Sequence, residues 1–489
     1  MKYLISLDIG TSSLRAILFN EKMQVVKMDQ EEISSSYPFP GWVEQDPDEL
    51  WQKTNQVLNR VSKEVLDKKE KIEGINITNQ RETVIAWSKK TSQPISKAIV
   101  WQDRRTAEYC KKMQKQGKGK LIYEKTGLRL DPYFSASKIN WIFNNVKQAR
   151  ILNKNNDLLV GTVDTWLIWK LTNGQNHLTD VSNASRTMLF NIKSLGWDKD
   201  LLKIFNIPLT ILPKVISSAS SKQNFGRVVL GGQQIPILAV CGDQTSALYG
   251  EQCFKKGETK ATYGTGGFVV VNAGSKIKLN NPKLITTIGW QINKEITYAL
   301  EGSIFQSGGS IKWLRDNLGL FKNYEEINSL SFQAKDSQGV YLIPAFVGLG
   351  APYWLPEVRG FISGLSHQTQ KGHLINAAIE AAAFQVNDIL EIIKKDYKLK
   401  VIKIKVDGGL TKNPYLLQFQ ADISSVAVNK SQNEEMTGWG VALMAAKILN
   451  WPLPVCVADD HFKPLMASNQ RKEKITGWKK NVAWVCHKV

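Results

Sequence analysis

The sequence predicts an α/β protein of two lobes with a cleft between them. A chain of 489 residues is too long for a single hydrophobic core. A strand, a turn rich in Gly, Thr and Ser, and a second strand occur twice, at residues 3–19 and again at residues 261–271. Glycine lets the backbone approach a ligand closely, and exposed N–H groups with hydroxyls form an anion-binding concavity. One such turn alone would be an ordinary hairpin, but the pair indicates two lobes that bind one polyphosphate.

The first lobe is predicted to open with a three-stranded meander, a helix and a further strand. Residues 24–33 predict the third strand of the meander, and residues 74–78 predict the strand after the helix. Asp46 as N-cap and Pro47 at the first helical position mark the helix start, because proline has no N–H to lose there. The apolar face of this helix carries Leu50, Thr54, Val57, Leu58, Val61 and Val65.

The second lobe is predicted to follow a related plan. After its hairpin, the predicted elements are strands near residues 286–291 and 296–300, a helix over 305–318, a long helix over 373–394 and a strand over 401–406. We place the boundary near the middle of the chain, which gives lobes of residues 1–250 and 251–489. Because ligands bind preferentially between such units, the cleft is the expected functional site.

The composition is that of an ordinary globular protein, with 43% hydrophobic and 22% charged residues. No apolar run has the length needed to cross a bilayer, and Asp8 interrupts the N-terminal apolar stretch, which argues against a secretion signal. We therefore expect a cytoplasmic protein with no membrane span. The five cysteines are scattered and lack C-x-x-C spacing, which predicts free thiols rather than a disulfide framework or a zinc site.

The net charge of +20 raises the question of nucleic-acid binding. The lysines lie mostly singly or in pairs among acidic residues, as in residues 67–71, and no zinc-finger, helix-turn-helix or RNA-binding strand pattern occurs. We therefore expect no nucleic-acid partner. The excess charge fits a solvated surface that also attracts an anionic nucleotide.

Asp243 and Gln244 follow a predicted strand over residues 235–240. An acid at a strand end can face the cleft and accept a proton from a hydroxyl that attacks phosphorus. The alternative is that Asp243 caps a short helix over residues 245–249, which is the commoner use of such a residue. The residue pattern leaves both interpretations open.

Arg81 and Glu82 lie between predicted strands over residues 74–78 and 83–87. They could be a donor and an acceptor for the hydroxyls of a polyol, or a surface ion pair of little energetic consequence. Trp101, at another strand end, could be an aromatic wall beside charged neighbours or a core residue.

Asp407-Gly408-Gly409 ends a predicted strand and precedes a helix over residues 414–423. The two glycines would let a flat ligand such as adenine lie against the backbone, although a plain strand-to-helix turn explains them equally well. Neither a G-x-x-x-x-G-K-[ST] loop nor a G-x-G-x-x-G fingerprint occurs. A nucleotide would therefore be held by the two hairpin turns.

Longer ordered segments point to a family. One signature is matched by Tyr133-x-Ser135-x-x-Lys138-Ile139-x-Trp141, and a second by Gly360-x-Ile362-x-Gly364-Leu365 followed by the segment 373–380. On these segments the chain resembles the FGGY carbohydrate kinases over residues 6 to about 449, and within them the glycerol kinase branch. The segments typical of that branch are residues 40–47, 77–83, 131–135, 183–188 and 348–354.

The resemblance implies the two-lobed actin-like (ribonuclease H-like) ATPase fold and ATP-dependent phosphorylation of glycerol to sn-glycerol 3-phosphate with Mg²⁺. It implies that Asp243 is the catalytic base and that Asp8 lies near the metal ion. The positions that match glycerol contacts are Arg81, Glu82, Trp101, Tyr133, Asp243, Gln244 and Phe268. The positions assigned to the nucleotide are Thr11, Ser12, Ser13, Arg15, Thr265, Gly308, Lys312, Gly409 and Asn413. We further expect a homo-oligomer, either a dimer or a tetramer.

Some positions depart from the family pattern. Ile9 stands in place of the usual Gln, Gly267 in place of the usual Cys, and Lys312 where a Gln often contacts the nucleotide. Residues 231–234 match a loop that carries an arginine in relatives with an allosteric sugar-bisphosphate site, but here the arginine is missing. We therefore expect such control to be absent or weak.

Two alternatives compete with the glycerol assignment. The near alternative is a sister kinase that acts on another polyol or a ketose. Four residues argue against it because they match a small triol pocket: Trp101, Phe268, Arg81 and Glu82. The distant alternative is a chaperone ATPase or a filament former of the same fold. Such proteins use water as nucleophile and lack a polyol pocket, so Arg81, Glu82 and Tyr133 argue against it.

Overall fold

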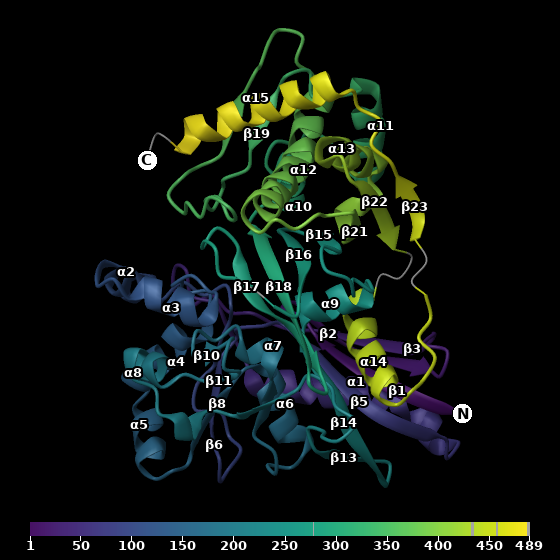
Figure 1. Ribbon diagram of the computed structural model, residues 1–489. Helices are drawn as coiled ribbons and strands as arrows, with labels where there is room; N and C mark the ends of the chain where they lie inside the picture. The colour runs from purple at the N-terminus through teal and green to yellow at the C-terminus, as the bar shows by residue number, and fades with distance from the viewer. Residues whose placement is uncertain (277, 432–434, 456–457, 487–489) are drawn as a thin grey trace.

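The computed structural model describes residues 1–276, 278–431, 435–455 and 458–486. It has two lobes, one built mainly from the first half of the chain and the other from the second half (Figure 1). Each lobe is organised around one large mixed sheet covered by helices. The two-lobed α/β architecture predicted from the sequence is confirmed.

The first sheet contains the predicted hairpin and its neighbours. Its strand order is β13 (Arg227–Leu230), β14 (Gln233–Gly242), β5 (Lys71–Asn79), β1 (Lys2–Ile9), β2 (Ser13–Asn20) and β3 (Val25–Glu32). The strands β1, β2 and β3 form an antiparallel meander, and β5 and β14 run parallel to β1 on its other side. Helix α1 (Pro47–Asp67) begins as predicted, with the Asp46 side chain accepting from Asp48 N, and every predicted residue of its apolar face is buried.

The second sheet repeats this arrangement. Its order is β17 (Ile285–Ile292), β18 (Glu295–Ile304), β16 (Gly267–Gly274), β15 (Thr259–Tyr263), β21 (Lys403–Asp407), β22 (Ala427–Ser431) and β23 (Ala458–Phe462). Again a hairpin, β15–β16, is extended on one side by an antiparallel strand, and β21 and β22 lie parallel to β15 on the other side. The two hairpins therefore occupy equivalent places in the two sheets.

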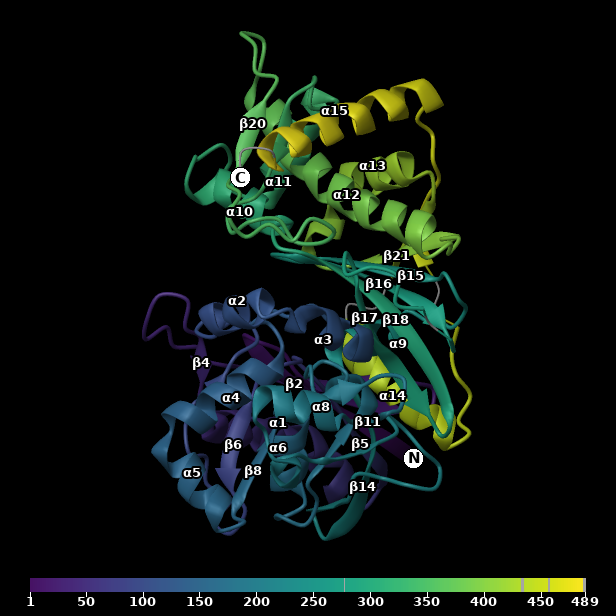
Figure 2. The same ribbon diagram turned by 60° about the vertical axis from the view of Figure 1, so that its left-hand side comes forward.

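Two helices join the sheets. Helices α9 (Asp243–Gly250) and α14 (Met436–Ile448) pack on each other, and α14 contacts β1, β5 and β14 of the first sheet, as Figures 1 and 2 show from two sides. A Cβ at Gly440 would lie 1.9 Å from Ser246 O, so only glycine allows the two helices to approach this closely. The segment 436–448 thus lies against the first sheet although it follows most of the second lobe in sequence, and the boundary at residue 250 stays a prediction.

The remaining elements cover the sheets and extend the lobes. In the first lobe they are β4 (Glu44–Gln45), β6 (Ile85–Ser88), β7 (Ala98–Ile99), α2 (Ala107–Lys115), α3 (Lys118–Thr126), α4 (Ser135–Asn145), α5 (Lys147–Lys154), β8 (Leu158–Gly161), α6 (Val163–Leu171), β9 (Leu178–Asp180), α7 (Val181–Ala184), β10 (Phe190–Asn191), β11 (Gly196–Trp197), α8 (Lys199–Phe205) and β12 (Lys214–Ile216). In the second lobe they are α10 (Gly308–Asp316), α11 (Tyr324–Ala334), β19 (Tyr341–Ile343), β20 (Phe361–Ser363), α12 (Lys371–Asp396), α13 (Pro414–Ser424) and α15 (Ser468–Cys486).

Several predicted elements differ from the observed ones at their ends, and three of them bear on the site. The helix predicted over 305–318 is α10, which begins at Gly308 and ends at Asp316, because β18 runs to Ile304 and residues 305–307 connect the two elements. The strand predicted over 83–87 is β6, which starts at Ile85. The helix predicted over 245–249 begins at Asp243.

The expectations of no membrane span and of free cysteines can be compared with the described residues. None of their helices combines the length and the apolar character that a bilayer span requires. Cys110, Cys241 and Cys253 are buried free thiols and Cys486 is a half-buried one, while Cys456 lies outside the described residues.

Candidate active site

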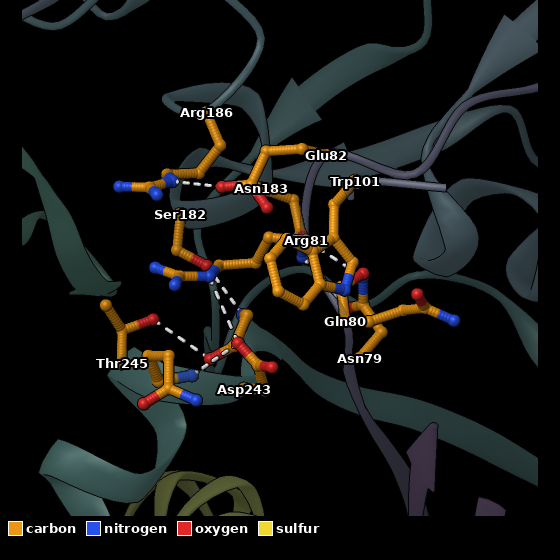
Figure 3. Close-up of polar contacts among 12 residues, drawn as sticks. Asn79, Gln80, Arg81, Glu82, Trp101, Ser182, Asn183, Arg186, Asp243 and Thr245 are labelled. Carbon is orange, nitrogen blue, oxygen red and sulfur yellow. Dashed lines mark hydrogen bonds and ion pairs between the residues drawn. The ribbon is translucent and has the colours of Figure 1, made fainter. Parts of the chain in front are cut away.

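The candidate site forms where three parallel strands of the first sheet end side by side. Ile9 of β1, Asn79 of β5 and Gly242 of β14 lie in one row of the register. The residues that follow them therefore meet at one edge of the sheet. This register brings Arg81 and Asp243 together from positions far apart in the chain (Figure 3).

Arg81 lies between two carboxylates. Its Nε is 3.0 Å from Asp243 Oδ1, and its Nη1 donates to Glu301 Oε2 at 2.6 Å. The guanidinium is buried, whereas about a quarter of the Asp243 side chain (24%) is exposed. A Cβ at Gly242 would lie 2.6 Å from Arg81 Cδ, so this glycine provides the room in which Arg81 lies. Gly242, not Asp243, is the N-cap of α9, so the capping interpretation of Asp243 is wrong.

Glu82 is paired with Arg186 rather than with its neighbour Arg81. Arg186 Nε donates to Glu82 Oε1 at 2.5 Å, and both side chains are buried. Thr83 N donates to Arg81 O at 2.8 Å, and Glu82 between them has a φ of 64°. This is a strained γ-turn, which turns the two side chains in different directions. The interpretation of Arg81 and Glu82 as a surface ion pair is wrong.

Two residues of this network were not predicted as site residues. Glu301, on β18 of the second sheet, accepts from both Arg81 and Arg186, the latter at 2.9 Å from Nη2 to Oε1. Burial alone would raise the pKa of Glu301, but Arg186 and Arg81 hold it below its ordinary value. The available signal was an acid directly after the apolar segment 298–300 of a predicted strand, and for Arg186 its place in a branch-specific segment.

Aromatic side chains lie beside this network. Trp101 is half-buried, which excludes a purely core role, and its ring packs edge-on against Tyr133 with centroids 5.6 Å apart. Trp101 Nε1 donates to Thr11 Oγ1 at 2.9 Å, so the aromatic wall also contacts the first hairpin turn. Lys138 Nζ donates to the backbone carbonyl of Tyr133 at 2.5 Å. Desolvation raises the pKa of the Tyr133 phenol. The phenol therefore stays protonated and can donate a hydrogen bond.

The second lobe contributes a face of its sheet. Phe268 pairs with Thr262 and Ser303, and the next residue of β16 on the same face, Val270, pairs with Glu301. Directly paired residues and alternate residues of a strand share a face. Phe268 is therefore on the face from which Glu301 reaches Arg81.

The two hairpin turns join β1 to β2 in the first sheet and β15 to β16 in the second. Gly10 N donates to Ser13 O at 2.9 Å within the first turn. In the second turn, Gly308 N donates to Gly264 O at 2.8 Å and Gly309 N to Thr265 O at 2.9 Å. Thr265 itself is exposed, so its hydroxyl is accessible to a ligand.

Asp8 is the last residue but one of β1 and pairs directly with Arg15 of β2. Desolvation raises the pKa of Asp8 to about 7, with Arg15 opposing the rise and the carboxylates of Asp243 and Glu435 adding to it. Arg15 Nη1 forms an ion pair with Glu435 Oε2 at 2.6 Å. Asp8, Asp243 and Glu435 thus concentrate negative charge near the first turn.

The other predicted nucleotide residues lie on the second lobe. A Cβ at Gly408 would lie 2.6 Å from Tyr263 O, which keeps the loop after β21 directly against the second hairpin. Gly409 and Lys312 are exposed. Asn413 is the N-cap of α13, accepts from Leu416 N at 3.0 Å and donates to Asn328 Oδ1 at 2.8 Å, so it also has a structural role.

Comparison with known proteins agrees with this geometry. The model of the FGGY family of carbohydrate kinases matches residues 3–250 as the N-terminal domain and residues 259–449 as the C-terminal domain. The chain belongs to the FGGY family of carbohydrate kinases. This FGGY chain is 42% identical over 495 residues to a glycerol kinase of Staphylococcus epidermidis, with 98% of each chain covered.

Solved structures lead to the same family. The crystal structure of Plasmodium falciparum glycerol kinase with ADP matches with a TM-score of 0.93 and 35% identity, covering 99% of this chain and 98% of that one. A ligand-bound xylulose kinase from Lactobacillus acidophilus matches with a TM-score of 0.86 at 20% identity, covering 100% and 97% of the chains. The latter shows the shared fold alone, and together they confirm the actin-like ATPase fold of the FGGY kinases.

Proposed function

We propose that this chain catalyses the ATP-dependent phosphorylation of glycerol to sn-glycerol 3-phosphate. The observation that carries the proposal is the pairing of Arg81 with Asp243 at 3.0 Å, at the sheet edge that also bears the first phosphate turn. The similarity to the glycerol kinase of Staphylococcus epidermidis supports the choice of glycerol.

In this mechanism Asp243 is the general base. Its partly exposed carboxylate accepts the proton of the terminal hydroxyl as that oxygen attacks the γ-phosphorus of ATP. Arg81 fixes one oxygen of the carboxylate, so that the other faces the substrate. Holding both reactants in line supplies much of the acceleration in phosphoryl transfer.

The proposed glycerol pocket combines charged and polar side chains with an aromatic wall. Arg81 and Gln244 donate to hydroxyls, Glu82 accepts from one, and the protonated Tyr133 phenol donates a further hydrogen bond. The proposed contacts to the carbon skeleton are Trp101 and Phe268. A three-carbon ligand with three hydroxyls would form hydrogen bonds to these polar groups and pack its carbon atoms against the aromatic rings.

The proposed nucleotide site joins both lobes. Thr11, Ser12, Ser13 and Arg15 would contact the phosphates from the first lobe, and Thr265 from the second. The adenosine would lie on the second lobe against Gly308, Lys312, Gly409 and Asn413. These residues belong to the two turns and to the loop that Gly408 keeps against the second turn.

The residues around Asp8 fit Mg²⁺. In kinases Mg²⁺ is held by one or two carboxylates together with substrate phosphates and waters. Within the described part of the chain no group of three or more His, Cys, Asp or Glu side chains that could hold a metal ion occurs, so substrate phosphates would have to complete the coordination of an ion at Asp8. The charges of Asp243 and Glu435 add to the raised pKa of Asp8. Asp8 would hold the ion, which when bound neutralises charge on the transferred phosphate. A cytoplasmic location and a homo-oligomeric assembly stay predictions of the sequence.

The test is turnover of purified protein with labelled ATP and a panel of glycerol, xylulose, ribulose and gluconate. Glycerol should stimulate ADP formation far more than the others, and equal stimulation by any of them contradicts the assignment. Replacing Asp243 with Asn should lower kcat by about 10²- to 10⁴-fold, the usual contribution of a general base, with ATP binding retained. Asp67→Asn, at the exposed end of α1, is the matched control and should leave kcat unchanged.

A further inference from the structure

Two oppositely charged side chains of the second sheet stand in one row across three strands. Lys260 of β15 pairs with Val270 of β16, and Val270 pairs with Glu301 of β18. Directly paired residues present their side chains on the same face. Lys260 is 1% exposed and Glu301 0% exposed, so neither charge is solvated. A buried charge is costly unless it is paired. Glu301 is paired with two arginines of the first lobe, whereas Lys260 lies between Gln244 of the first lobe and Asp407 of its own sheet.

Glu301 uses both of its oxygens on first-lobe arginines. Oε2 accepts from Arg81 Nη1 at 2.6 Å, and Oε1 accepts from Arg186 Nη2 at 2.9 Å. Nε of Arg81 contacts Asp243, and Nε of Arg186 contacts Glu82. Glu301 therefore restrains two arginines, each of which contacts a carboxylate of the proposed glycerol pocket.

Lys260 acts on Gln244 in the same manner. Its Nζ donates to Gln244 Oε1 at 3.0 Å and lies 3.8 Å from Asp407 Oδ2. An ammonium can only donate, so it fixes which end of the amide faces it. The Gln244 NH₂ group is thereby left to donate elsewhere, as a ligand to a glycerol hydroxyl must.

We infer that Lys260 and Glu301 are positioning residues through which the second lobe sets the hydrogen-bonding direction of Gln244 and Arg81 in the first. The inference rests on the proposed function of those two ligands. It follows that the polyol pocket is complete only when both lobes are in place. Neither Lys260 nor Glu301 needs to touch the substrate.

The experiment compares Glu301→Gln, Glu301→Asp and Lys260→Met with two controls, Glu295→Gln and Lys294→Met. The controls remove the same charges from exposed positions at the β17–β18 turn. Each variant is checked for folding by circular dichroism and thermal melting. The KM values for glycerol and for ATP and the kcat are then measured separately.

Glu301→Gln and Lys260→Met should each lower kcat/KM for glycerol by about 10- to 100-fold, as expected for losing a hydrogen bond to a charged group. The KM for ATP of Glu301→Gln should change by less than about twofold, because Arg81 and Arg186 face the polyol rather than the nucleotide. Glu301→Asp keeps the charge but withdraws it by one methylene, and should lie between Glu301→Gln and the wild type.

Folded variants with unchanged glycerol kinetics overturn the inference, and so does an equal rise in both KM values for Glu301→Gln, which would indicate a merely structural role. If neither Glu301 variant folds, Lys260→Met decides the question through the glycerol KM. If the wild type prefers another polyol, the proposed function fails. The same variants, measured on that polyol, then still decide whether Lys260 and Glu301 position the pocket.

Discussion

The two hairpin turns occupy equivalent places in the two sheets but are stabilised in different ways. The first turn has backbone hydrogen bonds from Gly10 N to Ser13 O and from Ile33 N to Ser12 O, both at 2.9 Å. Three side chains add to them: Gln45 Nε2 donates to Thr11 O at 2.6 Å, Gln80 Nε2 to Gly10 O at 3.1 Å, and Trp101 Nε1 to Thr11 Oγ1 at 2.9 Å. The second turn is held by the backbone of α10, whose first N–H groups donate to the carbonyls of Gly264 and Thr265.

The difference determines how each turn responds to mutation. Three separate side chains form hydrogen bonds to the first turn, so removing one leaves the other two in place. The second turn depends on close backbone approach, and the glycines at the start of α10 make that approach sterically possible. Damage to the second turn should therefore be abrupt, and damage to the first gradual.

Among variants of the two turns, Gly308→Ala should have the largest effect on the kinetics with ATP. A Cβ at this position would lie 2.8 Å from Gly264 O, and a backbone carbonyl cannot move aside as a flexible side chain can. An overpacked contact costs about 1–3 kcal/mol. We expect kcat/KM for ATP to fall by about 10- to 100-fold, with the KM for glycerol nearly unchanged.

The matched control for Gly308→Ala is Gly196→Ala. A Cβ at Gly196 meets no atom within 4 Å, and this glycine lies on β11 away from both turns. Steady-state kinetics with varied ATP should leave the control at the wild-type value. A Gly308→Ala enzyme with wild-type ATP kinetics would show that the second turn tolerates a shift of α10.

Local patterns predicted much of this fold from the sequence. Helix α1 begins at Pro47 and buries all of its predicted face, because a cap, a proline and a helical apolar period act within a few residues of one another. Asp243 was placed correctly at the end of a strand for the same reason. Such signals do not depend on the rest of the chain.

The partners of the site could not be predicted in this way. Arg81 contacts Glu301 across 220 positions of sequence, and Arg186 contacts Glu301 across 115. Adjacent Arg81 and Glu82 are not paired with each other, because the γ-turn at Glu82 directs them to different partners. These contacts follow from how the two sheets face each other, which no local period encodes.

Gln80→Met should produce an intermediate effect on the first turn. The buried Gln80 amide bonds Gly10 O, Gln45 Oε1 and the Thr83 hydroxyl, so methionine leaves polar groups without this partner. Each buried group left unpaired costs about 1–3 kcal/mol. We expect a lower melting temperature and a fall in kcat/KM for ATP of about tenfold. Gln148→Met on the exposed surface of α5 is the control, and equal loss in both variants would contradict a role in the turn.

Trp101→Phe should have the smallest effect. Phenylalanine keeps an aromatic ring against Tyr133 but removes the Nε1 donor to Thr11. One neutral hydrogen bond contributes about 0.5–1.5 kcal/mol, so kcat/KM for ATP should fall by about two- to tenfold, while Gln45 and Gln80 still hold the turn. Trp197→Phe removes a comparable donor, to Pro213 O at 2.8 Å, and should alter stability alone. A loss for Trp101→Phe as large as that for Gly308→Ala would mean that the side chains do not share the turn, and the contrast between the two lobes would disappear.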